Sequence, residues 1–100
     1  MTDKELLYIR AVAEERSISK AAQKLFITQP SLSQCIQRIE NTLGTRLFTR
    51  TSSGLTLTYA GERYCQIAGQ ILRIYNDFEL EVSDINNLKK GRVTIGITSY

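Results

Sequence analysis

The sequence contains no histidine, the side chain that most often serves as a general base or a metal ligand. Its only two cysteines, Cys35 and Cys65, stand outside any ligand spacing, so we interpret both as small apolar residues of an intracellular protein. A glycine-rich phosphate loop, a metal-binding cluster and a nucleophile motif are also absent. We therefore expect no enzyme, and no metal or cofactor bound to this segment.

Long apolar runs are also missing. The N-terminus, MTDKELLYIRAV, mixes acidic and basic residues and has no long apolar stretch, so it does not read as a signal peptide. No run in the sequence approaches the length of roughly 20 apolar residues that a membrane-spanning helix needs. We expect a cytoplasmic protein without a membrane partner.

Acidic residues are scarce in one part of the chain. Between residues 16 and 58, a single carboxylate, Glu40, accompanies six basic residues, which gives this segment a net charge of +5, compared with +3 for the whole chain. From residue 61 to residue 100, five basic and five acidic residues balance. A polyanionic partner requires such a local positive field, although an ordinary solvated surface could carry the same charge.

The apolar spacing predicts three helices in the first half of the chain, over about residues 4–15, 20–25 and 29–42. The only proline, Pro30, falls in the first turn of the third helix, where its missing N–H costs nothing, and Gly44 can end that helix. Each helix follows residues that can cap it, namely Thr2 or Asp3, Ser17 or Ser19, and Thr28. A tight turn therefore joins the second and third helices.

The third helix has two chemically different faces. The apolar face is expected in the core and consists of Leu32, Ile36, Ile39 and Leu43. The opposite face is polar and consists of Pro30, Gln34, Gln37 and Asn41. Amides can pair with base edges in the major groove, and glutamine suits the N6 and N7 atoms of adenine. A merely solvated helix is the alternative interpretation, but it would carry more glutamate and lysine on this face.

A hairpin and a long helix are predicted after Gly44. Apolar residues on both sides of the turn-forming residues 51–54 predict two short strands, which Arg46 and Arg50 bracket. A helix-turn-helix followed by a hairpin is a winged helix. The long helix runs from Ala60 to about Asn86, and we expect its apolar stripe to pair with a second copy through Tyr64, Ile67, Ile71, Ile74, Phe78, Val82 and Ile85.

The last ten residues, GRVTIGITSY, alternate apolar and polar side chains and predict a strand over residues 93–97. A lone terminal strand has no strand-rich region to pair with. We therefore expect the sequence to be the front portion of a longer chain, cut just inside its next domain.

The run SISKAAQKLFITQPSLSQCIQRIENTLGTRLFTRTSSGLTLTYAGE resembles the N-terminal DNA-binding domain of LysR-type bacterial transcriptional regulators. The resemblance implies a mainly α fold, with a winged helix-turn-helix domain at residues 1–58, a dimerisation linker helix at 59–88, and a hinge and first strand of a truncated α/β effector-binding domain at 89–100. It also implies double-stranded DNA as partner, a homodimer or tetramer, contact with RNA polymerase, and a small-molecule effector bound by the missing C-terminal domain. The residues that carry it are Ala21, Ala22, Leu25, Thr28, Gln29, Pro30, Ser31, Ser33, Ile39, Glu40, Leu43, Gly44, Leu47, Phe48, Arg50, Leu57, Thr58, Ala60 and Gly61.

The resemblance also implies roles for individual residues. Contacts to base edges are implied for Gln29, Pro30, Ser33 and Gln34, and contacts to the DNA backbone for Thr28, Ser31 and Arg38. Arg50 is implied to contact DNA from the wing, and the candidate set is completed by Gln37 and Ser53. Two residues depart from the family's pattern, because Gln34 and Ser53 each stand where relatives often carry arginine. Ser99 matches a region that helps to bind an effector's acidic group.

These observations predict a sequence-specific DNA-binding regulator that reads a promoter inverted repeat through the helix starting near Thr28 and the wing near Arg50. The alternative is a winged-helix module for protein interaction or assembly with a coiled-coil stalk, which the stripe of the long helix fits equally well. The basic segment and the glutamine-rich face distinguish the two functions and favour DNA.

Overall fold

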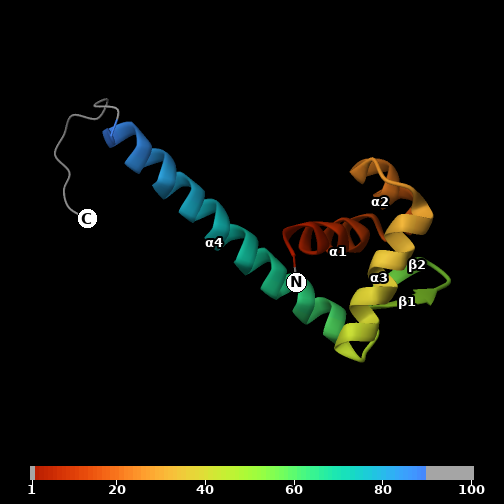
Figure 1. Ribbon diagram of the computed structural model, residues 1–100. Coiled ribbons are helices and arrows are strands. Elements are labelled where there is room, and N and C mark those ends of the chain that lie inside the picture. Colours follow the sequence, from red (N-terminus) through yellow and green to blue (C-terminus); the bar gives the residue numbers. More distant parts are fainter. Residues whose placement is uncertain (1, 90–100) are drawn as a thin grey trace. The chain divides into compact units, whose positions relative to one another are not determined.

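The computed structural model describes residues 2–89, and its elements follow the predicted order (Figure 1). Three helices come first: α1 (Asp3–Glu15), α2 (Ile18–Leu25) and α3 (Gln29–Leu43). A two-stranded antiparallel hairpin, β1 (Phe48–Thr51) and β2 (Gly54–Leu57), and a long helix, α4 (Tyr59–Lys89), follow. The mainly helical fold with a hairpin wing is thereby confirmed. The predicted strand at 93–97 and Ser99 lie outside the described residues.

The chain forms two compact units, Met1–Gln70 and Ile71–Tyr100. The boundary between them falls inside α4, so the first unit contains α1 to α3, the hairpin and the start of α4. The described part of the second unit is the remainder of α4, residues 71–89.

Local capping bonds explain where the first two helices begin. The Thr2 hydroxyl oxygen accepts the Glu5 N–H at 3.1 Å, and the Glu5 carboxylate accepts the Thr2 N–H at 3.2 Å, which completes a capping box. The Ser17 hydroxyl oxygen accepts the Lys20 N–H at 3.1 Å. Because the first N–H groups of a helix have no partner within it, these bonds fix the starts at Thr2 and Ser17.

The core of the first unit forms where α1, α2 and α3 pack against one another. Burying one large aliphatic side chain stabilises the fold by about 1.5–3 kcal/mol, and five such residues are almost fully buried. These are Leu6, Ile9, Val12, Leu32 and Leu47. Ala21 and Ala22 of α2 are buried too, and their small side chains let α1 and α2 approach closely. This packing holds α3 with one face inward and the other exposed.

Leu43 and Tyr64 depart from the predicted pattern. Leu43 was expected in the core but is 50% exposed, because it is the last residue of α3 and the left-handed turn at Gly44 ends the helix directly after it. Cys35 is buried instead, on the same face as Leu32 and Ile36. Tyr64 was expected on the dimerisation stripe but is only 5% exposed, so it packs into the core of the first unit.

The part of α4 that belongs to the second unit exposes many apolar side chains. Ile74 is 66% exposed and Phe78 is 57% exposed, and Ile71, Tyr75 and Leu80 are also open to solvent. Exposed apolar area of this kind marks an interaction surface when it is contiguous. Between residues 2 and 89, no helix combines the length and the apolar character that crossing a membrane would require.

Candidate nucleic-acid interface

The start of α3 is built by Thr28 and Ser31. The Thr28 oxygen accepts the Ser31 N–H at 3.2 Å, and the Thr28 hydroxyl donates to the Ser31 oxygen at 2.8 Å. The proton of Thr28 is therefore used within the cap, whereas the Ser31 O–H has no acceptor among residues 2–89. Of these two hydroxyls, Ser31 is the one that can donate to an external phosphate oxygen.

The polar face of α3 is open to solvent. Gln29, Pro30, Gln34, Gln37 and Arg38 are exposed, and Ser33 is half-buried. The only carboxylate of the helix, Glu40, is 14% exposed at its side chain and is engaged by the chain itself. The exposed face of α3 thus carries amides, hydroxyls and a guanidinium, and no free negative charge.

A hollow of about 680 Å³ lies between α3 and the hairpin. From α3 it is lined by Ser33, Gln37 and Asn41, and from the hairpin region by Arg46 and Arg50. Donor and acceptor groups from two separate elements therefore line one concave surface. Its position beside the polar face of α3 makes it a continuation of that face.

The strand register explains why Arg50 reaches this hollow. Phe48 pairs with Leu57 and Arg50 pairs with Leu55, and residues directly opposite in a hairpin place their side chains on the same face. Phe48 and Leu55 are buried, so Arg50 lies on the inward face, nearer to the tip, where it remains exposed. The wing therefore directs this guanidinium toward the hollow beside α3.

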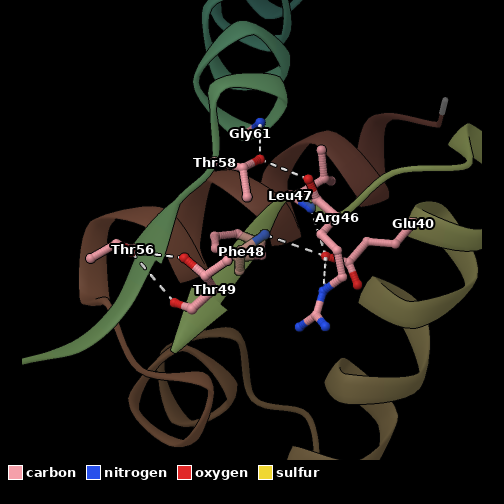
Figure 2. Close-up of polar contacts among 8 residues, drawn as sticks. All are labelled: Glu40, Arg46, Leu47, Phe48, Thr49, Thr56, Thr58 and Gly61. Carbon is pink, nitrogen blue, oxygen red and sulfur yellow. Dashed lines mark hydrogen bonds and ion pairs between the residues drawn. The ribbon is translucent and has the colours of Figure 1, made fainter. Parts of the chain in front are cut away.

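Glu40 ties the wing to α3, as Figure 2 shows. One oxygen of its carboxylate accepts the N–H of Leu47 at 2.7 Å and that of Phe48 at 3.3 Å, and lies 3.9 Å from Nε of Arg46. Two backbone donors and one charge therefore converge on a single oxygen of a largely buried side chain. This contact sets the distance between α3 and the wing across the 680 Å³ hollow.

The wing is also fastened to the start of α4 (Figure 2). The Thr58 hydroxyl donates to the carbonyl oxygen of Arg46 at 2.7 Å and accepts the N–H of Gly61 at 3.0 Å. The Thr58 N–H donates to the carbonyl oxygen of Leu47 at 3.0 Å. Gly61 lies so close to Leu47 that a Cβ atom there would overlap the Leu47 carbonyl. The base of the wing is therefore a closely packed junction.

Some basic side chains of the first unit are already paired. Lys24 lies 3.5 Å from a carboxylate oxygen of Glu14 and 3.5 Å from one of Glu15, while Arg46 contacts Glu40. Among residues 2–89, Lys20, Arg38 and Arg50 form no such ion pair. The free positive charge therefore includes side chains of α2, α3 and the wing.

The cysteines are unreactive in this setting. Both are free thiols, Cys35 buried and Cys65 half-buried, and burial raises the pKa of each thiol above its ordinary value. They therefore stay protonated at neutral pH and are poor nucleophiles and metal ligands. Within the described residues, no three histidine, cysteine, aspartate or glutamate side chains come together as a metal site.

This arrangement of helices and wing matches a known protein family. Residues 4–62 match the model of the bacterial regulatory helix-turn-helix proteins of the lysR family. The chain belongs to the lysR family. The matched residues include α1 from its second residue onward, all of α2 and α3, the wing and the junction at Gly61.

Individual relatives of this lysR-family chain agree with the match. It is 43% identical over 98 residues to the HTH-type transcriptional regulator BudR of Klebsiella aerogenes, which covers 95% of this chain and 68% of BudR. It is 38% identical over 91 residues to the HTH-type transcriptional regulator PgrR of Escherichia coli (strain K12), covering 91% of this chain and 30% of PgrR. The chain spans about a third of the length of most of the curated relatives that it matches.

A solved structure agrees as well. The crystal structure of a complex of the BenM DBD with catB site 1 DNA superposes with a TM-score of 0.80 at 37% identity, over 86% of this chain and 96% of that chain. The fold of the lysR-family chain is therefore that of a protein seen on DNA.

The predicted DNA-contacting residues of the lysR-family chain fall into two groups. The α3 residues share the start and exposed side of that helix, whereas Arg50 and Ser53 belong to the wing. Sequence reasoning did not identify Arg16, in the turn between α1 and α2, as a partner of the wing. Its Nε donates to the Leu55 carbonyl oxygen at 3.2 Å, across 39 positions of sequence. No local sequence signal marks such a contact.

Proposed function

We propose that this chain is the DNA-binding segment of a transcriptional regulator that recognises specific double-stranded DNA. The observation that carries the proposal is the exposed face of α3, which presents amides and hydroxyls without a free carboxylate, beside a hollow lined by Arg50. Amides read base edges in the major groove, and guanidinium groups bind phosphates. A solvent-exposed helix without a ligand would not need this composition.

The proposed roles divide along the surface. Base-edge contacts are assigned to Gln29, Pro30, Ser33, Gln34 and Gln37. Backbone contacts are assigned to Thr28, Ser31 and Arg38 from α3 and to Arg50 and Ser53 from the wing. The hydroxyl proton of Thr28 is used within the cap, so Thr28 acts by ordering the start of α3. The neighbouring Ser31 hydroxyl donates the hydrogen bond to the phosphate.

Helix α4 supplies the proposed partner contact. A homodimer would bury the apolar stripe of α4, with Ile67, Ile71, Ile74, Phe78, Val82 and Ile85 as the interface; Val82 and Ile85 are half-buried in the single chain and the other four are exposed. A dimer presents two reading helices, so the preferred DNA site is an inverted repeat. Residues 1–58 would then act as the DNA-binding domain and residues 59–88 as the dimerisation helix.

The proposal extends to the whole regulator. Residues 89–100 would be the hinge and first strand of an effector-binding domain that takes a small molecule, and the full-length protein would form dimers or tetramers, contact RNA polymerase and work in the cytoplasm. These assignments rest on membership in the lysR family. None of them requires catalysis by this segment.

The test is a binding titration with two duplexes. One is selected from a random pool by the purified protein, and the other has the same composition in scrambled order. We expect the selected duplex to bind at least about a thousandfold more tightly, and the affinity for both to fall steeply as salt rises. Equal binding of the two duplexes would contradict sequence-specific recognition. Salt-independent binding would instead favour a protein-interaction module.

A further inference from the structure

Arg50 also lines a second, smaller hollow of about 270 Å³. The other side chains around it come from separate parts of the first unit. Arg16 and Ser17 belong to the turn between α1 and α2, Ser19 to α2, and Gln29 is the first residue of α3. No aspartate or glutamate lines this hollow. Two guanidinium-bearing residues, two hydroxyls and an amide therefore surround one small space.

Arg16 is held at the hollow by the wing. Its backbone is left-handed, with φ of 54°, and its carbonyl oxygen accepts the Leu55 N–H at 3.3 Å. Its Nε donates to the Leu55 carbonyl oxygen at 3.2 Å, and one Nη donates to the Ser53 oxygen at 3.5 Å. A guanidinium has five N–H donors, so three remain for a ligand. The turn and the wing are thereby fixed to each other before any ligand binds.

The two arginines at the hollow lack a counter-charge. Neither Arg16 nor Arg50 forms an ion pair within residues 2–89, in contrast to Lys24 and Arg46. Two like charges beside one small space repel each other, and an anion between them would turn that repulsion into attraction. The electrostatics of the hollow therefore favour an anionic ligand.

The size and the donors of the hollow fit a single phosphate group. Its volume, about 270 Å³, is below the usual 300–1,000 Å³ of small-molecule sites, but it is ample for one phosphate. Guanidinium groups match phosphate oxygens in planar, two-donor geometry, and serine hydroxyls and an amide can supply further donors. Gln29, at the edge of the proposed reading face, places this hollow next to the DNA.

We propose that this hollow binds one phosphate of the DNA strand, shared between Arg16 and Arg50. The inference rests on the proposed function and deepens it, because it adds Arg16 as a DNA-binding residue and assigns both arginines to the same phosphate. The bond between Arg16 and Leu55 holds Arg16 at the hollow that Arg50 also lines.

The test is a methylphosphonate scan of the selected duplex, in which single phosphates are made neutral one at a time. For the parent protein, one position per half-site should weaken binding by about tenfold, the effect of a charge-assisted hydrogen bond. Arg16→Gln and Arg50→Gln should each weaken binding to the unmodified duplex and reduce sensitivity at that same position, and the double variant should abolish it. Arg73→Gln removes an exposed positive charge from α4 and should leave the scan unchanged.

The salt dependence separates phosphate binding from a purely structural role. Because one phosphate is shared, the slope of log K against log[salt] should flatten in Arg16→Gln, and in the double variant it should flatten further but by no more than about 0.9. Arg16→Lys keeps the charge but loses the bond to Leu55, so it should retain most of the slope. An unchanged slope in Arg16→Gln would show that Arg16 only supports the wing and would overturn the proposal.

Two further outcomes would also overturn it. Loss of sensitivity at two different phosphates in the two variants would show that the arginines do not share a ligand. The second outcome combines two results: inorganic phosphate at matched ionic strength competes with DNA for the parent but not for Arg16→Gln, and the methylphosphonate scan of Arg16→Gln keeps the pattern of the parent. The hollow would then be a site for free phosphate and not for a phosphate of the DNA. If the parent binds the selected and scrambled duplexes equally, the proposed function itself fails. The titration of the parent is therefore done before any variant is compared.

Discussion

Helix α3 and the part of α4 in residues 71–89 both carry apolar side chains at helical spacing, yet they use them in opposite ways. α3 buries Leu32, Ile36 and Ile39 in its own unit and exposes a polar face. In α4, Ile74 and Phe78 remain exposed in the single chain. The comparison indicates different partners, because α3 offers hydrogen-bonding groups suited to base edges whereas α4 offers apolar area suited to a second copy.

The most damaging substitution is expected at the junction between the wing and α4, inside the first unit. In Gly61→Ala, the added methyl group would overlap the Leu47 carbonyl and lie 2.8 Å from a methyl carbon of Leu57. Backbone cannot move aside cheaply at this junction, so we expect a loss of about 3 kcal/mol in the free energy of unfolding. The measurement is urea denaturation of the parent and the variant.

The same helix supplies the control for that substitution. A Cβ atom at Gly69 would meet nothing within 4 Å, so Gly69→Ala should stabilise the helix by up to about 1 kcal/mol through its better helix propensity. Equal stability changes at the two glycines would mean that the junction is not closely packed.

The next largest effect is expected on dimerisation through α4. Ile71→Asp or Ile74→Asp introduces a charge into the proposed interface once from each subunit, so the dimer dissociation constant should rise by about a hundredfold or more. Sedimentation equilibrium measures it. Asn76→Asp adds the same charge at an exposed polar position of α4 and should remain dimeric. If Ile74→Asp dimerises as tightly as Asn76→Asp, the stripe is not the contact.

The third prediction tests the contact by which Glu40 holds the wing against α3. Glu40→Gln removes the charge that accepts two backbone N–H groups, at Leu47 and Phe48, while keeping the shape of the side chain. We expect a loss of about 1–2 kcal/mol in stability, and weaker DNA binding because the wing is less well held. Glu62→Gln, at an exposed position, should change neither quantity. Full DNA affinity in Glu40→Gln would show that the wing is positioned by its other contacts.

The smallest effect concerns Tyr64, whose buried hydroxyl has no hydrogen-bond partner among residues 2–89. Tyr64→Phe should raise stability by up to about 1 kcal/mol. Burial raises the pKa of Tyr64 to about 12 from its ordinary value of 10. The unfolded chain therefore loses this proton at a lower pH than the folded chain, so the free energy of unfolding is unaffected below pH 10 and falls as the pH rises toward 12. The alkaline loss of stability should be smaller in Tyr64→Phe, and an identical loss would place the titrating group elsewhere.

Local features of the fold were predictable because their causes lie within a few residues. Thr2, Ser17 and Thr28 cap the three helices as expected, since a hydroxyl and the N–H three positions later meet wherever a helix starts. The end of α4 was predicted less well. Asn86 and Asn87 did not stop the helix, which continues to Lys89, because asparagine only weakly opposes helix formation.

Features that depend on tertiary packing were not predictable. Tyr64 fits the apolar stripe by spacing, but only the packing of the first unit shows that it is buried there. Arg16 counted as one of several basic residues until the fold placed it against Leu55. The polar face of α3 followed from helical periodicity alone, whereas the second hollow required the turn, α3 and the wing to be placed together.

Gln34→Ala tests whether the exposed face of α3 reads base pairs. Gln34 is exposed on that face, and its amide can form two hydrogen bonds to one base. Fluorescence anisotropy titrations with the selected and the scrambled duplex measure the effect. We expect a loss of about 1–3 kcal/mol on the selected duplex, relaxed preference at one base pair per half-site, and no change on the scrambled duplex. Equal weakening on both duplexes would contradict it, because Gln34 would then read no base.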